Sequence, residues 1–310
     1  MRWNIPSDEL VKTLVNAGVP RAIAERDVDL VANSALGPAL IRALRQVDRQ
    51  AELTELLKAL SRGAKLLELP RLPGAEEFFA HYWSTNTPFV VRGFIDQWER
   101  PFRPTFADLR RRFGDTVVEI AQGRDAYADP GLHFEKTVTS IPLAAFLDIV
   151  LEQPGNDAYM VARNATLGIA LSKLLDETHP PSELFDEKLK GSGISLWLGP
   201  ANTRTLLHHD GTNNLFCQVL GRKRVWLVPP FLTHIAESAV GHYATKRPSD
   251  PDVLPYAREV VLEPGDAVFL PVGWWHEVES LSPSLSLALV GFNRPNKFSY
   301  QPGRTKPKDV

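Results

Sequence analysis

Two stretches of the sequence, residues 199–230 and 260–290, are built from short apolar runs separated by glycine and proline turns. Such runs, bounded by turn residues, predict β-strands. Short antiparallel strands with tight turns between them favour a barrel or a jelly roll over an open sheet. The expected strands are Leu215–Leu220, Lys223–Val228, Val260–Leu262, Ala267–Leu270 and Leu285–Val290.

The first 65 residues have a different pattern, which predicts helices. Ser7 is followed by Asp8 and Glu9, a pattern typical of a helix N-cap with acidic residues in the first turn. Amphipathic runs follow at 22–33 and 39–60, separated by a glycine–proline break.

The expected fold is therefore mainly β: a double-stranded β-helix (jelly roll, cupin) with an N-terminal α-helical region and flanking helices. We expect the helical region over residues 1–65, the catalytic domain over 66–300 and a polar tail over 301–310. Further helices are expected at 75–82, 105–113 and 142–152, and residues 66–74 are interpreted as a link. The amphipathic N-terminal segments need a partner surface. They can form a homodimer interface, pack on the barrel as an appendage, or dock a substrate.

Composition excludes several classes of protein. The chain has 310 residues, a net charge of −2 and a pI near 6.5, which gives no general attraction to nucleic acid. Cys217 is the single cysteine, so no internal disulfide is possible, and the chain fits a reducing compartment. The N-terminus lacks an apolar signal core, and no apolar stretch approaches a membrane span. We expect a cytoplasmic protein that binds neither nucleic acid nor a membrane.

The tripeptide His208-His209-Asp210 and the later His276 predict a metal site. Residues i and i+2 of a strand point to the same side, so His208 and Asp210 share one face and His209 faces away. Two imidazoles and one carboxylate form the facial triad of non-haem Fe(II) oxygenases, which leaves positions for a co-substrate and O2. A hydrogen-bonded or solvated histidine beside an aspartate is the alternative for the tripeptide alone. Both strand-rich stretches have the same succession of short strands and turns, and each supplies part of the site. This similarity favours the metal-site interpretation.

Lys223 and Thr205 are candidate partners of a co-substrate. 2-Oxoglutarate chelates iron through its 1-carboxylate and 2-keto oxygen, and its distal carboxylate needs a cation and a hydroxyl. Lys223 begins the strand after the Gly221 turn, and Thr205 lies three residues before His208. The alternative is that Lys223 belongs to a solvated basic turn, Arg222-Lys223-Arg224.

These stretches resemble the JmjC-type, or cupin-8, branch of Fe(II)/2-oxoglutarate oxygenases, and are similar to the factor-inhibiting-HIF type of asparaginyl hydroxylase. The resemblance covers about residues 68–295 and includes a looser match at Asn86–Trp98. The two specific motifs are Leu196–Pro230 (LWLGPANTRTLLHHDGTNNLFCQVLGRKRVWLVPP) and Leu262–Ser280 (LEPGDAVFLPVGWWHEVES).

The resemblance implies a role for individual residues. His208, Asp210 and His276 become the iron ligands. The residues that it assigns to 2-oxoglutarate are Lys223, Thr205 and Tyr159 on the distal carboxylate, and Asn214 close by. Many relatives carry an asparagine in the final barrel strand, where this chain has Gly291, with Asn293 nearby.

The implied function is hydroxylation of a protein or peptide side chain with Fe(II), 2-oxoglutarate and O2, releasing succinate and CO2. Hydroxylation of a small molecule, such as a free amino acid or a natural-product intermediate, and N-methyl demethylation use the same oxidant and stay open. A cupin that only binds metal, or an isomerase, is the non-oxygenase alternative, against which Lys223 with Thr205 argues. Loops at 121–139 and 231–259 are expected to border the site.

Overall fold

The computed structural model describes residues 7–32, 37–128, 130–131, 133–164, 166–232 and 243–298. The chain divides into two compact units, residues 1–60 and 61–310. The expected tail at 301–310 lies outside the described residues. None of the described helices is long and apolar enough to cross a membrane.

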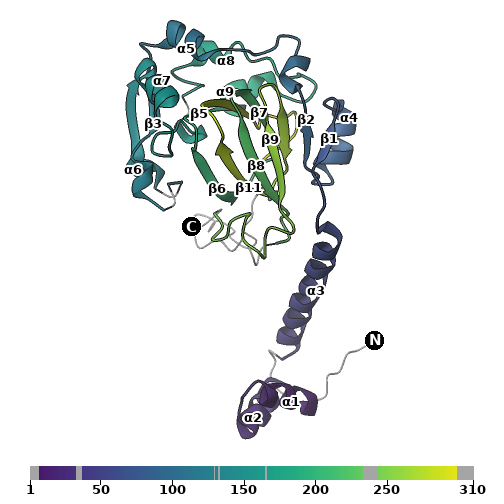
Figure 1. Ribbon diagram of the computed structural model, residues 1–310. Helices are drawn as coiled ribbons and strands as arrows, with labels where there is room; N and C mark the ends of the chain where they lie inside the picture. The colour runs from purple at the N-terminus through teal and green to yellow at the C-terminus, as the bar shows by residue number, and fades with distance from the viewer. Residues whose placement is uncertain are drawn as a thin grey trace, which may run out of the picture. The chain divides into compact units, whose positions relative to one another are not determined.

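The first unit is helical, as its sequence predicts (Figure 1). Its helices α1 and α2 pack on each other through a small apolar cluster of Val11, Ala24 and Val28. The long helix α3 leaves several leucines of its last two turns exposed, among them Leu56 and Leu60. The helices are α1 (Ser7–Asn16), α2 (Arg21–Ala32) and α3 (Gly37–Ser61).

The second unit contains the strands together with short helices. Its α-helices are α4 (Ala75–Phe78), α5 (Phe106–Phe113), α6 (Phe134–Thr137), α7 (Leu143–Glu152), α8 (Ser172–Leu175) and α9 (Lys190–Gly193). A π-helical turn follows α4 at Phe79–Trp83, and 3₁₀ turns lie at Phe94–Gln97, Arg124–Ala126, Ala162–Asn164 and Glu187–Leu189. The strands are β1 (Leu67–Leu69), β2 (Phe89–Val91), β3 (Val117–Ala121), β4 (Val138–Pro142), β5 (Ile194–Gly199), β6 (Arg204–His209), β7 (Asn214–Leu220), β8 (Lys223–Val228), β9 (Arg258–Leu262), β10 (Ala267–Leu270), β11 (Trp275–Ser280) and β12 (Ser284–Leu289).

Strands β5 to β12 form the expected jelly roll, and this prediction of the fold is confirmed. The large sheet has the order β1-β2-β10-β7-β12-β5, and the small sheet has the order β6-β11-β8-β9. Consecutive strands change sheet at each step except from β8 to β9, which pair with each other. Figure 1 shows the two sheets, with β3, α5 and α7 to one side. The 231–259 segment thus covers most of the β8–β9 connection, residues 229–257, together with the first two residues of β9, and its residues 233–242 lie outside the described residues.

The central strands β7 and β10 of the large sheet are buried on both faces because both faces are covered. In β7, Phe216 belongs to the cluster inside the barrel, whereas Cys217 packs in the larger outer cluster with helical residues such as Phe78 and Leu109. Burial also raises the pKa of the Cys217 thiol well above its usual range. The strands of a sheet that is covered on both sides have continuous apolar sequences, as these strands do.

The prediction of a link over residues 66–74 was incomplete, because this segment contains the short strand β1. It pairs in parallel with β2, with Glu68 opposite Val90. A run of three residues carries no periodicity that separates a strand from a linker. The helix expected at 75–82 was also only partly right, since α4 ends at Phe78 and gives way to the π-helical turn.

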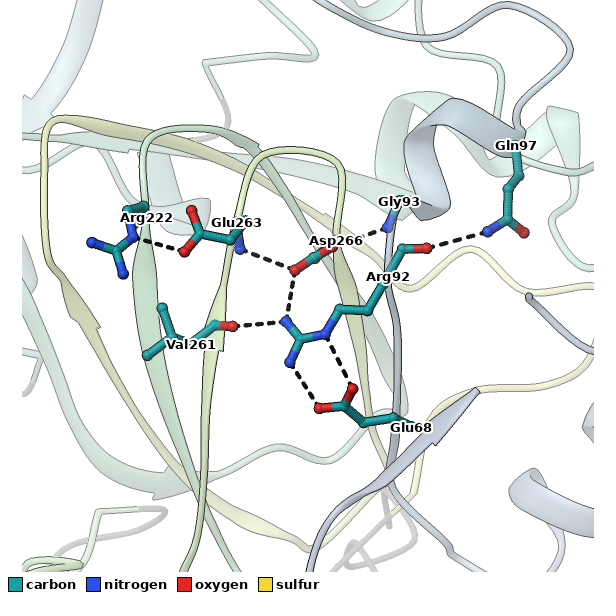
Figure 2. Close-up of polar contacts among 8 residues, drawn as sticks. All are labelled: Glu68, Arg92, Gly93, Gln97, Arg222, Val261, Glu263 and Asp266. Atoms are coloured by element: carbon teal, nitrogen blue, oxygen red, sulfur yellow. Dashed lines mark hydrogen bonds and ion pairs between the residues drawn. The ribbon is translucent and has the colours of Figure 1, made fainter. Parts of the chain in front are cut away.

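A polar network fixes this edge of the large sheet to the β9–β10 turn (Figure 2). Arg92 donates to Glu68 at 2.8 Å, to the Val261 carbonyl at 2.8 Å and to Asp266 at 2.7 Å. The buried Asp266 carboxylate also accepts from the backbone N–H groups of Gly93, at 2.9 Å, and Glu263, at 3.0 Å. Asp266 therefore joins segments that are far apart in the sequence.

Candidate metal and co-substrate site

His208 and His276 lie opposite each other on neighbouring antiparallel strands. They are register partners in the β6–β11 pair, and their ring centroids are 4.2 Å apart. Asp210 follows the end of β6, and its Oδ2 lies 3.7 Å from Nε2 of His276. One ligand atom from each of the three residues lies within 4.8 Å of the other two. The structure thus brings the predicted triad together.

Backbone carbonyls orient both imidazoles for a metal. Nδ1 of His208 lies 2.8 Å from the Leu206 carbonyl, and Nδ1 of His276 lies 3.0 Å from the Trp274 carbonyl. A neutral imidazole that donates through Nδ1 presents the lone pair of Nε2 to a metal. Burial, followed by the nearby His276, lowers the pKa of His208 to about 4, so this ring is neutral at neutral pH, as a ligand must be. The donor set fits a divalent iron ion.

His209 is not part of this group. Its ring meets Trp275 edge-on, with centroids 4.5 Å apart and an interplanar angle of 90°. It also contributes to the cavity wall, but no atom of His209 is among the clustered ligand atoms. His209 is therefore excluded from the ligand group, as expected, but the prediction that it faces away from the cavity was only partly right, because it lines the same cavity.

A cavity of about 310 Å³ opens beside the triad. Lys223 lies under its wall: its Nζ donates to the hydroxyl of Tyr159 at 2.9 Å, and both side chains are fully buried. The neighbouring Arg222 and Arg224 are instead engaged in ion pairs at the surface. The alternative of a solvated basic turn is therefore wrong for Lys223.

A β-bulge in the β6–β11 pair places Thr205 on the cavity side of β6. His276 pairs with His208 and Val278 pairs with Thr205, so three steps along β6 match two steps along β11. Residues three apart on a regular strand point to opposite faces, and one extra residue restores the same side. Thr205 and His208 both line the cavity as a result.

Asn214, the first residue of β7, is buried and lines the same cavity. Its Oδ1 makes no hydrogen bond with any other described residue. A buried amide oxygen without a donor usually has a ligand or a water as its partner. The structure thus places Asn214 in the cavity wall, and its contact with a co-substrate stays a prediction.

Gly291 does not contribute to the cavity wall, where the preceding Val290 is found instead. A Cβ added at Gly291 would lie 3.0 Å from the Cα of Gly193, so the two backbones approach too closely for a side chain. Asn293 does not replace the missing asparagine, because its amide donates to the Ser182 carbonyl at 2.8 Å. Neither residue thus supplies the polar contact to the cavity that the resemblance led us to expect at the final barrel strand.

The two loops expected to border the site each contribute residues that the sequence did not single out. Tyr243, from the β8–β9 connection, stacks on His208 with centroids 5.6 Å apart. The next residue, Ala244, donates from its N–H to the Leu207 carbonyl at 2.8 Å and so extends the edge of β6. Arg124, from the 121–139 loop, lines the cavity and lies over the Tyr159 ring, with Cζ 5.2 Å from the centroid. No spacing distinguished these two from other arginines and tyrosines.

A jelly roll that carries two histidines and an aspartate beside a buried lysine–tyrosine pair has the fold and the ligand set of the JmjC class of Fe(II)/2-oxoglutarate oxygenases. The model of the cupin-like domain family matches residues 75–294, and the chain belongs to this family.

Curated relatives carry JmjC names. The chain is 27% identical over 260 residues to Jumonji C domain-containing protein 5 of Drosophila melanogaster, covering 75% of this chain and 62% of the relative. It is 27% identical over 277 residues to Lysine-specific demethylase JMJ31 of Arabidopsis thaliana, covering 74% and 50%. It is 25% identical over 274 residues to the human Bifunctional peptidase and (3S)-lysyl hydroxylase JMJD7, covering 74% and 86%. The chain thus spans less than two thirds of the length of the first two.

Proposed function

We propose that the protein is an Fe(II)- and 2-oxoglutarate-dependent hydroxylase that acts on a protein or peptide side chain. The observation that carries the proposal is the buried Lys223–Tyr159 pair beside the cavity that also holds the triad. Burial of an ammonium group is unfavourable without an anion beside it. A cupin that only binds metal requires no such group, whereas a 2-oxoglutarate site does.

Each group has a defined task in this proposal. His208, Asp210 and His276 hold the iron through one face of its coordination sphere. Lys223 and Tyr159, with Thr205, bind the distal carboxylate of 2-oxoglutarate. With iron bound, 2-oxoglutarate and O2 supply a two-electron oxidant for a C–H bond, and succinate and CO2 are released. Aromatic side chains of the cavity wall, such as Trp197 and Phe134, exclude water from the reacting atoms.

A protein substrate is supported by the names of relatives, one of which is a lysyl hydroxylase and another a lysine-specific demethylase. N-methyl demethylation is therefore the second candidate, and a small-molecule substrate stays a third.

The test has two stages. Succinate release from 2-oxoglutarate with Fe(II) and ascorbate separates an oxygenase from a metal-binding cupin. Mass spectrometry of peptides incubated with the protein then separates hydroxylation, which adds one oxygen, from demethylation, which removes one methylene. Turnover of 2-oxoglutarate with added oxygen in a peptide supports the proposal, and absence of succinate under all conditions contradicts it.

A further inference from the structure

Arg124 is a buried cation whose hydrogen-bond partners are all neutral. The residue is 5% exposed, and it lines the cavity. Nε donates to the Asn156 carbonyl at 2.9 Å, and Nη2 donates to the Arg204 carbonyl at 2.9 Å and to Oδ1 of Asn156 at 3.2 Å. A guanidinium carries five N–H donors and stays charged in proteins. These three bonds hold one edge of the group in place.

The other edge of the guanidinium has no hydrogen-bond partner among the described residues. Nη1 of Arg124 makes no hydrogen bond with any of the residues that the structure describes. Burial lowers the pKa of Arg124, and Asp125 and Asp157 are among the nearby groups that oppose this effect, but neither accepts a bond from the guanidinium. Burying a charge without a counter-ion is unfavourable, and such groups are usually paired. The fixed orientation and the unpaired edge together indicate a site for an anion.

Two molecules enter the cavity in the proposed reaction: the co-substrate, which is an anion with two carboxylates, and the substrate. The distal carboxylate of 2-oxoglutarate is matched by Lys223 with Tyr159, and its other carboxylate is matched by the metal. The other arginine of the cavity wall, Arg204, is engaged by Glu277. Asp210 is the single acidic residue among the described residues of the wall, and it is a metal ligand. Arg124 is thus a second fixed cation for which the co-substrate has no remaining carboxylate.

We propose that Arg124 binds the carboxylate of the substrate, and that the side chain presented to the iron is acidic, aspartyl or glutamyl. This inference rests on the proposed hydroxylase function and adds the class of its substrate. Asn156 is the positioning residue, since its Oδ1 accepts from Nη2 of Arg124 and also from the Arg204 N–H at 2.8 Å. The start of β6 and the guanidinium are therefore held by one side chain.

The test measures binding rather than turnover. The full-length protein is loaded with Mn(II) and 2-oxoglutarate without oxygen, and titrated by calorimetry with three blocked tripeptides, acetyl-Gly-X-Gly-amide, where X is Asp, Asn or Lys. Wild type is expected to bind the Asp peptide roughly tenfold or more tightly than the Asn peptide, as one charge-assisted bond predicts. Arg124→Gln should lose this preference and Arg124→Lys should retain part of it. The matched control Arg103→Gln, which removes a surface partner of Asp96, should keep the preference in full.

Equal binding of the Asp and Asn peptides to wild type, no binding of either at millimolar concentration, or a preference that survives in Arg124→Gln overturns the proposal. A tenfold loss of 2-oxoglutarate affinity in Arg124→Gln with unchanged peptide preference also overturns it, and assigns the residue to the co-substrate. Thermal unfolding of each variant identifies a folding defect. If Arg124→Gln is unfolded, the peptide preference of Arg124→Lys is used to test the proposal. Failure of the hydroxylase proposal is detected by a different measurement, the absence of succinate release by wild type. The peptide titrations do not depend on turnover, since they can be repeated with Mn(II) alone.

Discussion

His208 and His276 are cross-strand partners in the β6–β11 pair, and each donates its Nδ1 hydrogen to the carbonyl two residues before it in the chain. The same local arrangement therefore occurs on both strands and directs both Nε2 atoms to the space next to Asp210. The strand register therefore positions two of the three candidate ligands, and the third, Asp210, follows directly after β6.

The first prediction concerns iron retention. His208→Ala and Asp210→Ala should each lower iron affinity by more than the roughly 10- to 100-fold that loss of an outer-sphere partner costs, because only two ligands remain. Iron bound after desalting under nitrogen is the measurement. His209→Ala is the matched control and should keep its iron, since His209 packs against Trp275. The opposite order of effects would mean that the assignment of ligands along β6 is wrong by one residue.

The second prediction concerns the co-substrate. Lys223→Met removes the charge while keeping most of the buried volume. It should weaken 2-oxoglutarate binding roughly 30- to 150-fold, since a charge-assisted hydrogen bond contributes about 2–3 kcal/mol. Tyr159→Phe, which loses one hydroxyl, should have a smaller effect. Arg222→Met is the control because Arg222 lies next to Lys223 in the chain but forms an exposed ion pair with Glu263. Equal 2-oxoglutarate affinity for Lys223→Met and wild type, with iron still bound, would remove Lys223 from the site.

The third prediction concerns the network of Figure 2. Asp266→Ala leaves Arg92 and two backbone N–H groups without their shared acceptor, so we expect a loss of about 2–4 kcal/mol in the free energy of unfolding. Asp252→Ala, which breaks an exposed ion pair with Lys246, should cost clearly less. Urea denaturation measures both. Similar costs for the two variants would show that the network adds little to stability.

The fourth prediction uses two glycines with the same backbone angle. Gly221 and Gly63 both have φ of +69°, but a Cβ at Gly221 would collide with the Pro283 carbonyl, whereas a Cβ at Gly63 meets nothing within 4 Å. Gly63→Ala should cost about 1–2 kcal/mol, the strain of the left-handed conformation alone. Gly221→Ala should cost clearly more and should also weaken 2-oxoglutarate binding, since this turn precedes Lys223. Equal unfolding free energies for the two variants would show that the Pro283 contact relaxes without cost.

The fifth prediction concerns the proposed homodimer. In α3, Leu53, Leu56, Leu57 and Leu60 are exposed at a spacing that places them on one helical face. We propose that this face pairs with its equivalent in a second copy of the chain. The double variant Leu56→Glu/Leu60→Glu should then be monomeric in light scattering, while Ala59→Glu, outside the stripe, should stay dimeric. A monomeric wild type at high micromolar concentration would contradict the proposal.

Much of the fold and the identity of the candidate ligands could be predicted from the sequence by itself. The strands β8 and β10 were predicted with their observed bounds, because apolar runs between turn residues are a local signal. His208 and Asp210 were predicted to share a face because alternation along a strand is local as well. The buried state of Lys223 was not accessible in this way, since the flanking arginines give the same local pattern as a solvated turn.

Tertiary structure decided what depends on pairing between distant segments. Thr205 lies on the cavity side only because the β6–β11 register contains a bulge, and no property of β6 alone specifies one. Arg124 and Tyr243 reach the site from loops whose paths are fixed by contacts with β6 and Tyr159, so their positions could not be inferred from spacing. The sequence thus determined which groups can bind a metal, through periodicities that act over a few residues. Only long-range packing determined which other side chains face it, because that depends on contacts between residues many positions apart.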